Sequence, residues 1–275
     1  MVAKNWRVLV VNPGSTSTKV GLFEGEEKLF AETVSHDASK LAEFPTISDQ
    51  MPYRRDMILD LLDEHGVSLE TVDAFVGRGG GLQPLVGGTY EIDDVLLKDA
   101  RTGGNGIQHP AQLGSQIAYE FASIAGKPSF VVNPPDIDEA CDLARMTGVK
   151  GVYRHVRMHA LNLKETAIRH AATLGKRYEE CSFVVCHIGG GISISAHKDG
   201  RMIDGNDNVG GDGPITPTRC GTLPVISVLD YLAKGHDIEE TRTLCLTTGG
   251  FVNLCGSSDA REIQALADGG DAAAK

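Results

Sequence analysis

The sequence has few of the features that mark disulfide-stabilised, metal-binding or membrane-spanning proteins. Its six cysteines form no CxxC pair and no metal-site spacing, and several stand in apolar runs, which predicts buried, reduced thiols. No apolar stretch approaches the roughly 18 residues of a membrane-spanning helix, and residues 1–7 are too few and too polar for a signal peptide. The formal net charge of −11 disfavours nucleic acid and anionic membranes as partners. We expect a soluble, cytoplasmic protein.

Glycine is what the chain has in excess, at 33 of 275 residues, and the excess lies in short clusters and not in a linker. Hydrophobic residues make up 41% of the chain, which is enough for a folded core. The length suggests two domains or one large α/β domain, and the polar stretch 134–150 interrupts the strand pattern near the middle. We therefore expect two lobes, over residues 1–140 and 141–275.

Apolar spacing and glycine stops predict the regular elements. Periodic apolar side chains followed by a glycine indicate helices, and short apolar runs bounded by turns indicate strands. The expected elements are a helix ending before Gly66, a strand over 72–76, helices over 111–125 and 160–174, a strand over 128–132, a helix from Pro224 to Leu232 and a helix beginning near Asp259. In the acidic stretch 136–145, Glu139 and Asp142 are predicted to face solvent on a helix.

Two glycine-and-hydroxyl loops, far apart in the sequence, are built to one plan. The first, residues 12–19, reads Asn-Pro-Gly-Ser-Thr-Ser-Thr-Lys and follows the apolar run 8–11. The second, residues 187–191, reads His-Ile-Gly-Gly-Gly and follows the apolar run 183–186. After each loop come a strand-like run, a turn and another strand-like run. This repetition predicts a duplicated lobe with two phosphate-binding loops that face one cleft, and therefore phosphoryl chemistry.

The residue types of the first loop suit a phosphate group. Glycine lets the backbone approach closely, hydroxyl groups add donors, and Lys19 adds a positive charge. The loop lacks the GxxxxGK[ST] spacing, and a strand is expected after it instead of a helix, so it is not a P-loop of the Walker type. A tight hairpin turn that happens to carry hydroxyl groups is the alternative. The matched flanks of the two loops favour the phosphate interpretation.

Cationic and imidazole side chains stand near glycines elsewhere in the chain. Arg78, in segment 77–81, and Arg219, in segment 216–221, have room to present a planar guanidinium to a carboxylate or phosphoryl group. A solvated surface arginine is the alternative for each. Three histidines are candidates for a catalytic role against a structural, hydrogen-bonding one, namely His109, His159 and His187.

Acidic side chains near glycine-rich turns are candidates to hold Mg²⁺ through water, because Mg²⁺ favours few protein ligands and several waters. The candidates are Asp136, Asp138, Asp204, Asp207 and Asp212. The sequence does not choose among them.

Taken together, these segments resemble those of the butyrate kinases of the acetokinase family, in the superfamily that also contains acetate kinases, sugar kinases and actin. The resemblance covers essentially the whole chain and rests on segments 12–19, 77–80, 87–90, 187–193 and 212–224. It implies an α/β fold of two duplicated ribonuclease-H-like lobes around a nucleotide cleft. It also implies Mg²⁺-dependent transfer of a phosphoryl group between ATP and butyrate or a branched relative, giving ADP and an acyl phosphate. A homodimer or larger homo-oligomer is a further expectation from the resemblance.

The resemblance also implies roles for individual residues. Arg78 and Arg219 resemble the two arginines that neutralise the carboxylate and the transferring oxygens, and His159 resembles the histidine that hydrogen-bonds the transferring group. Asn12 would lie near the transferring phosphoryl group and Mg²⁺. The nucleotide would be bound by Ser15, Ser17 and Lys19 of the first loop, by His187, Gly189, Gly190 and Gly191 of the second, and by Asp259 and Arg261 near the nucleoside.

Two departures from the family pattern affect these expectations. Where the family has an acidic residue after the strand over 128–132, this chain has Asn133, a neutral and weaker ligand that would reach Mg²⁺ through water. Asp136 is a candidate substitute. The family also continues with a further strand, an adenosine loop and a terminal helix, so the second lobe is expected to be truncated here.

Two other functions stay open from the sequence. The departures favour, as an alternative, a catalytically impaired member that binds nucleotide or acyl ligand without turnover. A sugar kinase of the same superfamily is the third interpretation. Two arginines beside glycines suit a carboxylate better than a neutral polyol, so the carboxylate kinase is the preferred hypothesis.

Overall fold

The computed structural model describes residues 5–104, 106 and 108–275 of the chain. The first four residues, on which the expectation of no signal peptide partly rests, lie outside the described residues, as do positions 105 and 107. The chain divides into two compact units, unit 1 (Met1–Ile137) and unit 2 (Asp138–Lys275).

Unit 1 is built on a mixed six-stranded sheet with the strand order β3-β2-β1-β4-β6-β5. The strands are β1 (Arg7–Pro13), β2 (Ser17–Glu24), β3 (Glu27–Ser35), β4 (Ala74–Gly77), β5 (Thr89–Glu91) and β6 (Ser129–Val132). The first three form an antiparallel meander, whereas β1, β4 and β6 run parallel to one another. The carboxyl ends of β1, β4 and β6 therefore meet at one edge of the sheet.

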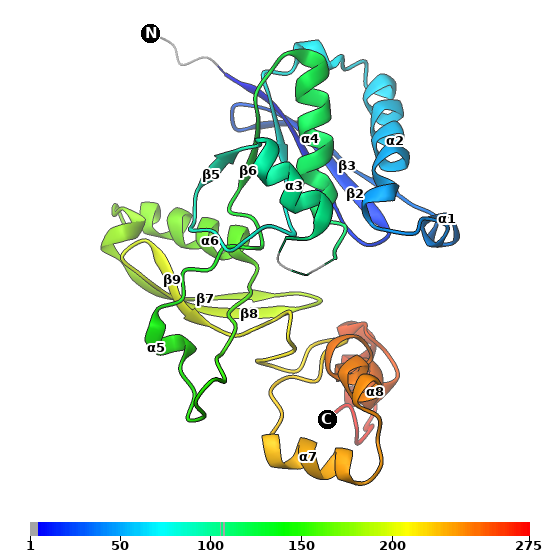
Figure 1. Ribbon diagram of the computed structural model, residues 1–275, viewed down its shortest axis with the longest axis vertical. Helices are drawn as coiled ribbons and strands as arrows, with labels where there is room; N and C mark the ends of the chain where they lie inside the picture. The colour runs from blue at the N-terminus through cyan, green and yellow to red at the C-terminus, as the bar shows by residue number, and fades with distance from the viewer. Residues whose placement is uncertain (1–4, 105, 107) are drawn as a thin grey trace. The chain divides into compact units, whose positions relative to one another are not determined.

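Helices of unit 1 cover the sheet and complete its core. They are α1 (Ala38–Ala42), α2 (Met51–Glu64), α3 (Asp94–Thr102) and α4 (Gln112–Ala125), with 3₁₀ turns η1 (Ser48–Gln50) and η2 (Leu69–Thr71). Helix α4 runs across β1, β4 and β6, and α2 and α3 pack beside it (Figure 1). The core gathers apolar side chains from β1, β2, α2 and α4, with Phe75 and Phe121 fully buried at its centre. Gly126 ends α4 in the left-handed conformation, as its glycine stop predicts.

One close approach of backbones fixes how α4 sits on the sheet of unit 1. A methyl group on Gly77 would lie 2.3 Å from the carbonyl carbon and oxygen of Gly114, in α4. A methyl group on Gly114 would lie 2.8 Å from the backbone nitrogen of Arg78. Two glycines therefore let the helix and the strand touch through their main chains, which places the start of α4 directly beside the residue that follows β4.

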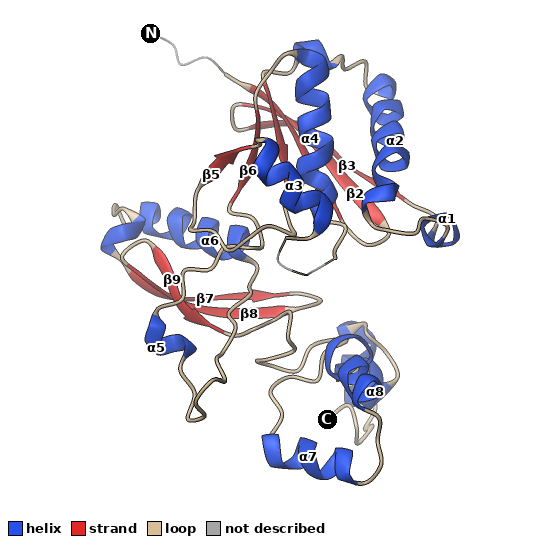
Figure 2. Ribbon diagram, in the orientation of Figure 1, coloured by secondary structure: helices blue, strands red, loops and turns tan. Residues whose placement is uncertain are grey.

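Unit 2 contains a second strand, loop, strand, turn, strand unit. Its antiparallel sheet consists of β7 (Ser182–Ile188), β8 (Ile192–Lys198) and β9 (Arg201–Gly205), in that order. Figure 2 shows α6 along this sheet and a separate group of helices towards the C-terminus. The helices are α5 (Asp142–Arg145), α6 (Ala160–Thr173), α7 (Val225–Ala233), α8 (Ile238–Thr243), α9 (Gly250–Cys255) and α10 (Ala260–Asp268), with the 3₁₀ turn η3 (Tyr178–Glu180) and the π-helical turn η4 (Leu244–Thr248).

Unit 2 exposes more of its apolar side chains than unit 1. Helix α7 buries none of its residues, and Val225 and Ile226 at its start are largely exposed. On β7, Val184 and Ile188 are each 77% exposed, while Val185 between them is buried. The buried side of this sheet packs against α6 through Leu163, Ala167 and Ala171.

The prediction for Glu139 is wrong. Its side chain is buried, and both carboxylate oxygens accept hydrogen bonds of 2.9 Å from Nζ of Lys164, in α6. The second oxygen also accepts from the backbone nitrogen of Met202, in β9. Asp142, by contrast, is exposed at the start of α5. The acidic stretch therefore sends one carboxylate into the interior, where an ion pair and a backbone donor compensate its charge.

The prediction of buried cysteines holds for one position, Cys181. All six thiols are free, and Cys181 is buried. Cys141, just before α5, is exposed. Cys186 is exposed because the alternation of β7 turns it to the same side as Val184. Within the described residues, no helix combines the length and the apolar character needed to cross a membrane.

Candidate functional site

In unit 1, four of the predicted residues gather where β1 turns into β2. Asn12 and Lys19 are directly opposite each other in the antiparallel pair, and Ser17 lies on the same side of β2 as Lys19. Ser15 and Lys19 are exposed, whereas Thr18 between Ser17 and Lys19 is fully buried. The loop therefore presents its hydroxyl groups and its lysine on one face and anchors itself by the other.

Arg78 joins this group from the neighbouring parallel strand. Its backbone nitrogen donates to the carbonyl oxygen of Val11 at 3.0 Å, and its Nη1 donates to Oδ1 of Asn12 at 3.3 Å. Burial lowers the pKa of the Arg78 guanidinium. Within the described part of the chain, Arg78 forms no ion pair with a carboxylate.

Asn133 follows β6 at the same edge of the sheet, where it shapes a turn. Its backbone has φ of 40°, in the left-handed region that asparagine tolerates better than most residues. Its Oδ1 accepts a hydrogen bond of 2.9 Å from the backbone nitrogen of Gly88. Asp136, three residues later, has its pKa raised to about 6 by burial. The proximity of Asn12, Arg78 and Asn133 follows from the shared carboxyl edge of β1, β4 and β6.

The glycine loop of unit 2 connects β7 and β8 in a tight turn. The backbone nitrogen of Gly189 donates to the carbonyl oxygen of Gly191 at 3.1 Å. Gly190 is exposed, with open space where a side chain would stand. A methyl group on Gly191 would lie 2.4 Å from Oδ1 of Asn208 and 2.6 Å from Nη1 of Arg219. Glycine is therefore needed at position 191 so that Arg219 and Asn208 can come up to the loop.

Arg219 is half-buried at this loop and is held by several neighbours. Its Nη1 donates to Oδ1 of Asn208 at 3.3 Å, and its backbone forms a turn with Thr216. The backbone of Thr216 also accepts from the nitrogen of Phe251, in α9. Nε of Arg219 is buried and finds no hydrogen-bond acceptor among the described residues. Burial lowers the pKa of its guanidinium, and the charge of Asp207 partly offsets this.

His159 and His187 stack on each other in unit 2. Their ring centroids are 3.8 Å apart, and the ring planes differ by 15°. Nδ1 of His159 is 2.8 Å from Oγ of Ser193, and Nδ1 of His187 is 2.9 Å from Oδ1 of Asn162. The structure thus brings together the histidine at the start of α6 and the histidine at the end of β7, and each ring is oriented by a polar neighbour.

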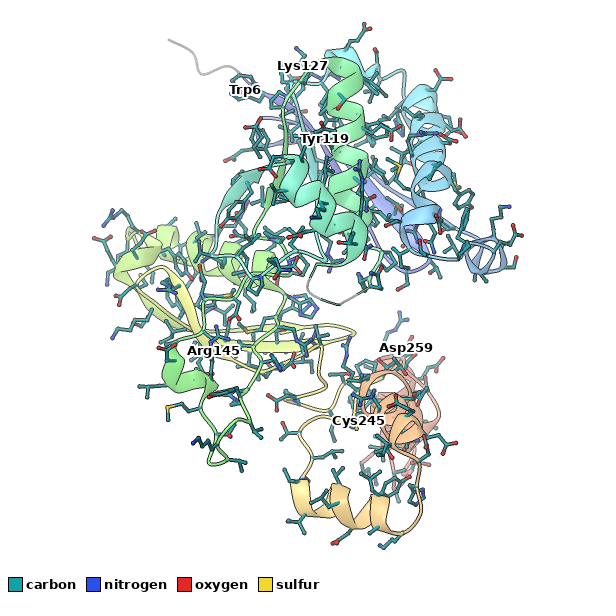
Figure 3. All side chains as sticks on the ribbon, in the orientation of Figure 1. Trp6, Tyr119, Lys127, Arg145, Cys245 and Asp259 are labelled. Carbon is teal, nitrogen blue, oxygen red and sulfur yellow. The ribbon has the colours of Figure 1, made fainter. Side chains whose placement is uncertain are left out.

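Asp259 and Arg261 form a local pair at the start of α10. Oδ1 of Asp259 caps the helix by accepting from the backbone nitrogen of Arg261, and their side chains are 2.5 Å apart. This pairing lowers the pKa of Asp259 to about 2. Asp259 lies among the C-terminal helices (Figure 3). Neither residue contacts the second glycine loop through a described hydrogen bond, so their place near a nucleoside stays a prediction.

His109 forms local hydrogen bonds near the start of α4. Its Nδ1 accepts from the backbone nitrogen of Ala111, and its own backbone nitrogen donates to the side chain of Gln112.

Some of the acidic candidates of unit 2 form ion pairs with arginines. Asp207 forms a two-point ion pair with Arg157, and Asp138 one with Arg145. No cluster of three or more metal-ligating His, Cys, Asp or Glu side chains occurs among the residues described.

The sequence interpretation missed several residues that shape the two loops. Arg54 of α2 reaches under the first loop, and Asn208 and Ser193 orient Arg219 and His159. A signal for Arg54 was present, since it shares the buried stripe of α2 with Ile58, Leu61 and Leu62. A cation on the apolar face of a helix must find buried partners, so this spacing marks a polar network. Asn208 and Ser193 give no comparable signal.

Comparison with known proteins supports a common fold over nearly the whole chain. Residues 146–275 match the sequence model of the acetokinase family. An acetate kinase from Porphyromonas gingivalis superposes with a TM-score of 0.73 at 22% identity, covering 98% of this chain and 75% of that one. A propionate kinase from Francisella tularensis gives a TM-score of 0.71 at 20% identity, with the same coverage of 98% and 75%.

A third solved structure, an acetate kinase from Entamoeba histolytica, has a TM-score of 0.68 at 18% identity and covers 98% of this chain and 72% of that one. At these identities the structural matches establish the fold. The chain thus has the mixed α/β, actin-like fold of acetate and propionate kinases, and its segment 146–275 carries the sequence pattern of the acetokinase family.

Proposed function

We propose that the protein transfers a phosphoryl group from ATP to the carboxylate of a short-chain fatty acid, as a member of the acetokinase family. The observation that carries this proposal is the position of Arg219. Its guanidinium lies against Gly191 of the second glycine loop, and its buried Nε lacks an acceptor among the described residues. A buried cation with an unused donor beside a glycine loop is suited to an anionic oxygen of a phosphoryl group.

The chemistry needs positioning and charge neutralisation, and no covalent nucleophile of the protein. A carboxylate oxygen of the acid attacks the γ-phosphorus of ATP in line, the bond to the β,γ-bridging oxygen breaks, and ADP leaves with that electron pair. The acid is ionised at neutral pH, so no strong general base is required. Arg78 and Arg219 would neutralise the carboxylate and the transferring oxygens, and the oriented His159 would hydrogen-bond the transferring group.

The remaining predicted residues would bind the nucleotide. Ser15, Ser17 and Lys19 in unit 1 and His187 with Gly189, Gly190 and Gly191 in unit 2 offer hydroxyl, ammonium, imidazole and backbone donors. Exposed and open loop glycines such as Gly190 leave room for phosphate oxygens. We extend the proposal to Asp259 and Arg261 as a contact for the nucleoside.

The residues assigned to Mg²⁺ can hold the ion only if water molecules supply most of its ligands. The two residues assigned to Mg²⁺, Asn12 and Asn133, offer neutral amide oxygens, and Mg²⁺ commonly keeps several waters and one or two protein ligands. Asn12 and Asn133 would hold the ion through water, although each amide oxygen already accepts one hydrogen bond. When bound, Mg²⁺ would neutralise charge on the β- and γ-phosphates.

Butyrate or a branched relative is our proposal for the acyl group, on the segments that resemble the butyrate kinases. The similar solved structures are an acetate kinase and a propionate kinase by name, so acetate and propionate are the competing acids. The cytoplasmic location and the homodimer stay predictions.

The direct test is hydroxylamine trapping of acyl phosphate with the purified chain, ATP and Mg²⁺, using acetate, propionate and butyrate in parallel. We expect hydroxamate in the order butyrate above propionate above acetate. Arg219→Ala should lower the rate by about 100-fold or more, the scale of losing one oxyanion donor. Arg242→Ala is the matched control, because Arg242 is exposed and pairs with Glu239, its one ion-pair partner among the described residues.

A non-catalytic member of the family is the second candidate. The observation that favours it is Asn133, whose amide oxygen is engaged by Gly88 and which carries no charge for Mg²⁺. Saturable binding of ATP without hydroxamate from any of the three acids would support this alternative. Hydroxamate formation that Arg219→Ala abolishes would exclude it.

A further inference from the structure

Arg54, on α2 in unit 1, is a fully buried arginine placed beneath the first glycine loop. Its Nη1 donates to the carbonyl oxygens of Gly14 at 2.8 Å and Ser17 at 3.3 Å, and its Nη2 donates to that of Ser15 at 2.8 Å. Nε and Nη2 also donate to Oε1 of Gln50, one helical turn earlier. The planar guanidinium thus binds three main-chain oxygens of a four-residue loop.

The charge of Arg54 has no acidic counterpart nearby. Among the residues that the structure describes, no carboxylate lies within ion-pair distance of its guanidinium. Carbonyl and amide dipoles solvate it instead, and burial lowers its pKa. Lys164, the buried cation of unit 2, differs in having Glu139 as a partner. These acceptors are dipoles and carry no net negative charge, so the positive charge of Arg54 remains to attract an anion that binds close to it.

A second set of contacts holds the same loop from the side of β3. Thr18 Oγ1 is 2.7 Å from Nε2 of His36, and Nδ1 of His36 is 3.3 Å from the sulfur of Met57. A thioether sulfur can only accept a hydrogen bond, so Nδ1 of His36 carries the ring proton and Nε2 is left as an acceptor. Nε2 therefore accepts from the hydroxyl group of Thr18. The oxygen of that hydroxyl group in turn accepts from Nη1 of Arg54 at 3.3 Å. Burial and the charge of Arg54 lower the pKa of His36 to about 4, which keeps the ring neutral in this chain of hydrogen bonds.

These contacts decide which way the loop amides point. The carbonyl oxygens of residues 14, 15 and 17 face Arg54, and that of Thr16 accepts from the backbone nitrogen of His36 at 2.9 Å. In a trans peptide the next N–H points opposite to the carbonyl. The N–H groups of Ser15 and Thr16 therefore point away from Arg54, and neither donates a hydrogen bond within the described residues. Two successive outward amides with a cation behind them suit an anion.

We propose that Arg54 is a positioning residue that turns the amides of Ser15 and Thr16 outward and supplies the positive charge behind a phosphate held by this loop. The inference deepens the proposed function, since it concerns the loop assigned there to phosphate. It does not depend on turnover, because phosphate binding to the loop is measurable by itself.

The experiment measures how inorganic phosphate raises the melting temperature of the full chain, against chloride at matched ionic strength. Arg54→Met removes the charge and the fork at similar volume, and we expect phosphate affinity to fall roughly tenfold or more, as for loss of a charged hydrogen-bonding group. Arg54→Lys keeps the charge but replaces the planar fork, whose two Nη atoms share the carbonyl oxygens, by one nitrogen on a shorter side chain, so a smaller loss is expected. Ile58→Ala, a fully buried change on the same helix, is the control that lowers stability and leaves the phosphate effect unchanged.

An Arg54 that only stabilises the fold would lower the melting temperature equally with and without phosphate. A folded Arg54→Met variant with the wild-type response to phosphate would overturn the proposal, as would a wild-type chain that does not respond at all. If Arg54→Met does not fold, Arg54→Lys decides by the same criterion. In an active enzyme, the variants should raise the KM for ATP more than Ile58→Ala does. Absence of hydroxamate in the wild type would reject the proposed function and leave the phosphate measurement to judge Arg54.

Discussion

The two glycine loops share one chain plan but are held in different ways. The first is bound through its main-chain oxygens by Arg54, a side chain from the core of unit 1. The second is surrounded by side chains of unit 2 that approach its glycines, chiefly Arg219 and Asn208. The shape of the first loop is therefore set by the core beneath it, whereas the second loop depends on segments that arrive from other parts of its unit.

The same difference extends to the packing of the two units. Unit 1 joins its sheet and α4 through the backbones of Gly77 and Gly114. Unit 2 leaves α7 without a buried residue and places a charged pair, Lys164 and Glu139, in its interior. A close backbone contact is destabilised by any added side-chain atom, whereas a buried ion pair is destabilised when one of its two partners is removed. Single substitutions at these contacts test both contrasts.

The largest effect is expected from the buried ion pair of unit 2. Lys164→Met should lower the free energy of unfolding by about 3–5 kcal/mol, because it leaves the Glu139 carboxylate buried without its cation. The double variant Lys164→Met with Glu139→Leu should recover much of that loss. Urea unfolding of the three proteins measures both effects. If the double variant is no more stable than Lys164→Met, the loss does not come from an unpaired Glu139 carboxylate, and the expectation is wrong.

A similar but smaller loss is expected at the backbone contact of unit 1. Gly77→Ala should destabilise the chain by about 3 kcal/mol, since the new methyl group meets main-chain atoms of Gly114 and Ser115 that cannot turn aside. Thermal and urea unfolding provide the measurement. Gly66→Ala would be a poor control because Gly66 is left-handed, so Gly190→Ala, in open space, serves instead. Equal stability of the Gly77 and Gly190 variants would contradict close packing in unit 1.

Acid should weaken both units through one buried histidine in each. Burial lowers the pKa of His36 in unit 1 and of His197 in unit 2 to about 4, below the ordinary 6.5. The unfolded chain then binds more protons between these values, so stability is complete above pH 6.5 and is lost as pH falls towards 4. We expect a loss of about 2 kcal/mol per histidine between roughly pH 7 and 5.

Unfolding of His36→Gln and His197→Gln at the two pH values checks this prediction. Each variant should lose less stability on acidification than the wild type, and the exposed His155→Gln should behave like the wild type. Parallel pH profiles for all four proteins would refute the assignment.

The smallest effect on stability is expected at the second loop. Gly191→Ala pushes the flexible ends of Arg219 and Asn208 aside, so the free energy of unfolding should change by less than about 1 kcal/mol. Under the proposed function, hydroxamate formation should nevertheless fall about tenfold or more because the arginine is displaced. Gly148→Ala, a change in unit 2 outside the loop with nothing near its new methyl group, is the matched control. A fully active Gly191→Ala variant would contradict the proposed role of Arg219 in phosphoryl transfer.

The sequence predicted the parts of this fold that local chemistry dictates. The repeated strand, loop, strand, turn, strand units appear as β1–β3 and β7–β9, and the helices over 111–125 and 160–174 appear as α4 and α6 within a few residues. Glycine stops and apolar periodicity act over one or two turns of chain, so they can be interpreted without the fold. The apolar spacing of α4 also predicts that Ile124 is buried, but its side chain is exposed near the end of the helix.

The candidate site was predicted only in part, because its partners come from distant segments. Asn12, Lys19 and Arg78 lie together through strand pairing, and His159 stacks on His187. Glu139 looked like one of several surface acids until the fold placed Lys164 beside it, 25 residues away in sequence. Arg54 lies 36 to 40 residues from the loop that it binds.

The two glycine loops, the elements that flank them and the residue types that suit phosphate follow from the amino-acid sequence, because these depend on local backbone preferences and side-chain chemistry. Only the tertiary structure decided which charges are buried and what compensates them. A buried arginine or glutamate is stable where long-range folding brings carbonyl oxygens or an opposite charge within hydrogen-bond distance, and no short stretch of sequence contains those partners.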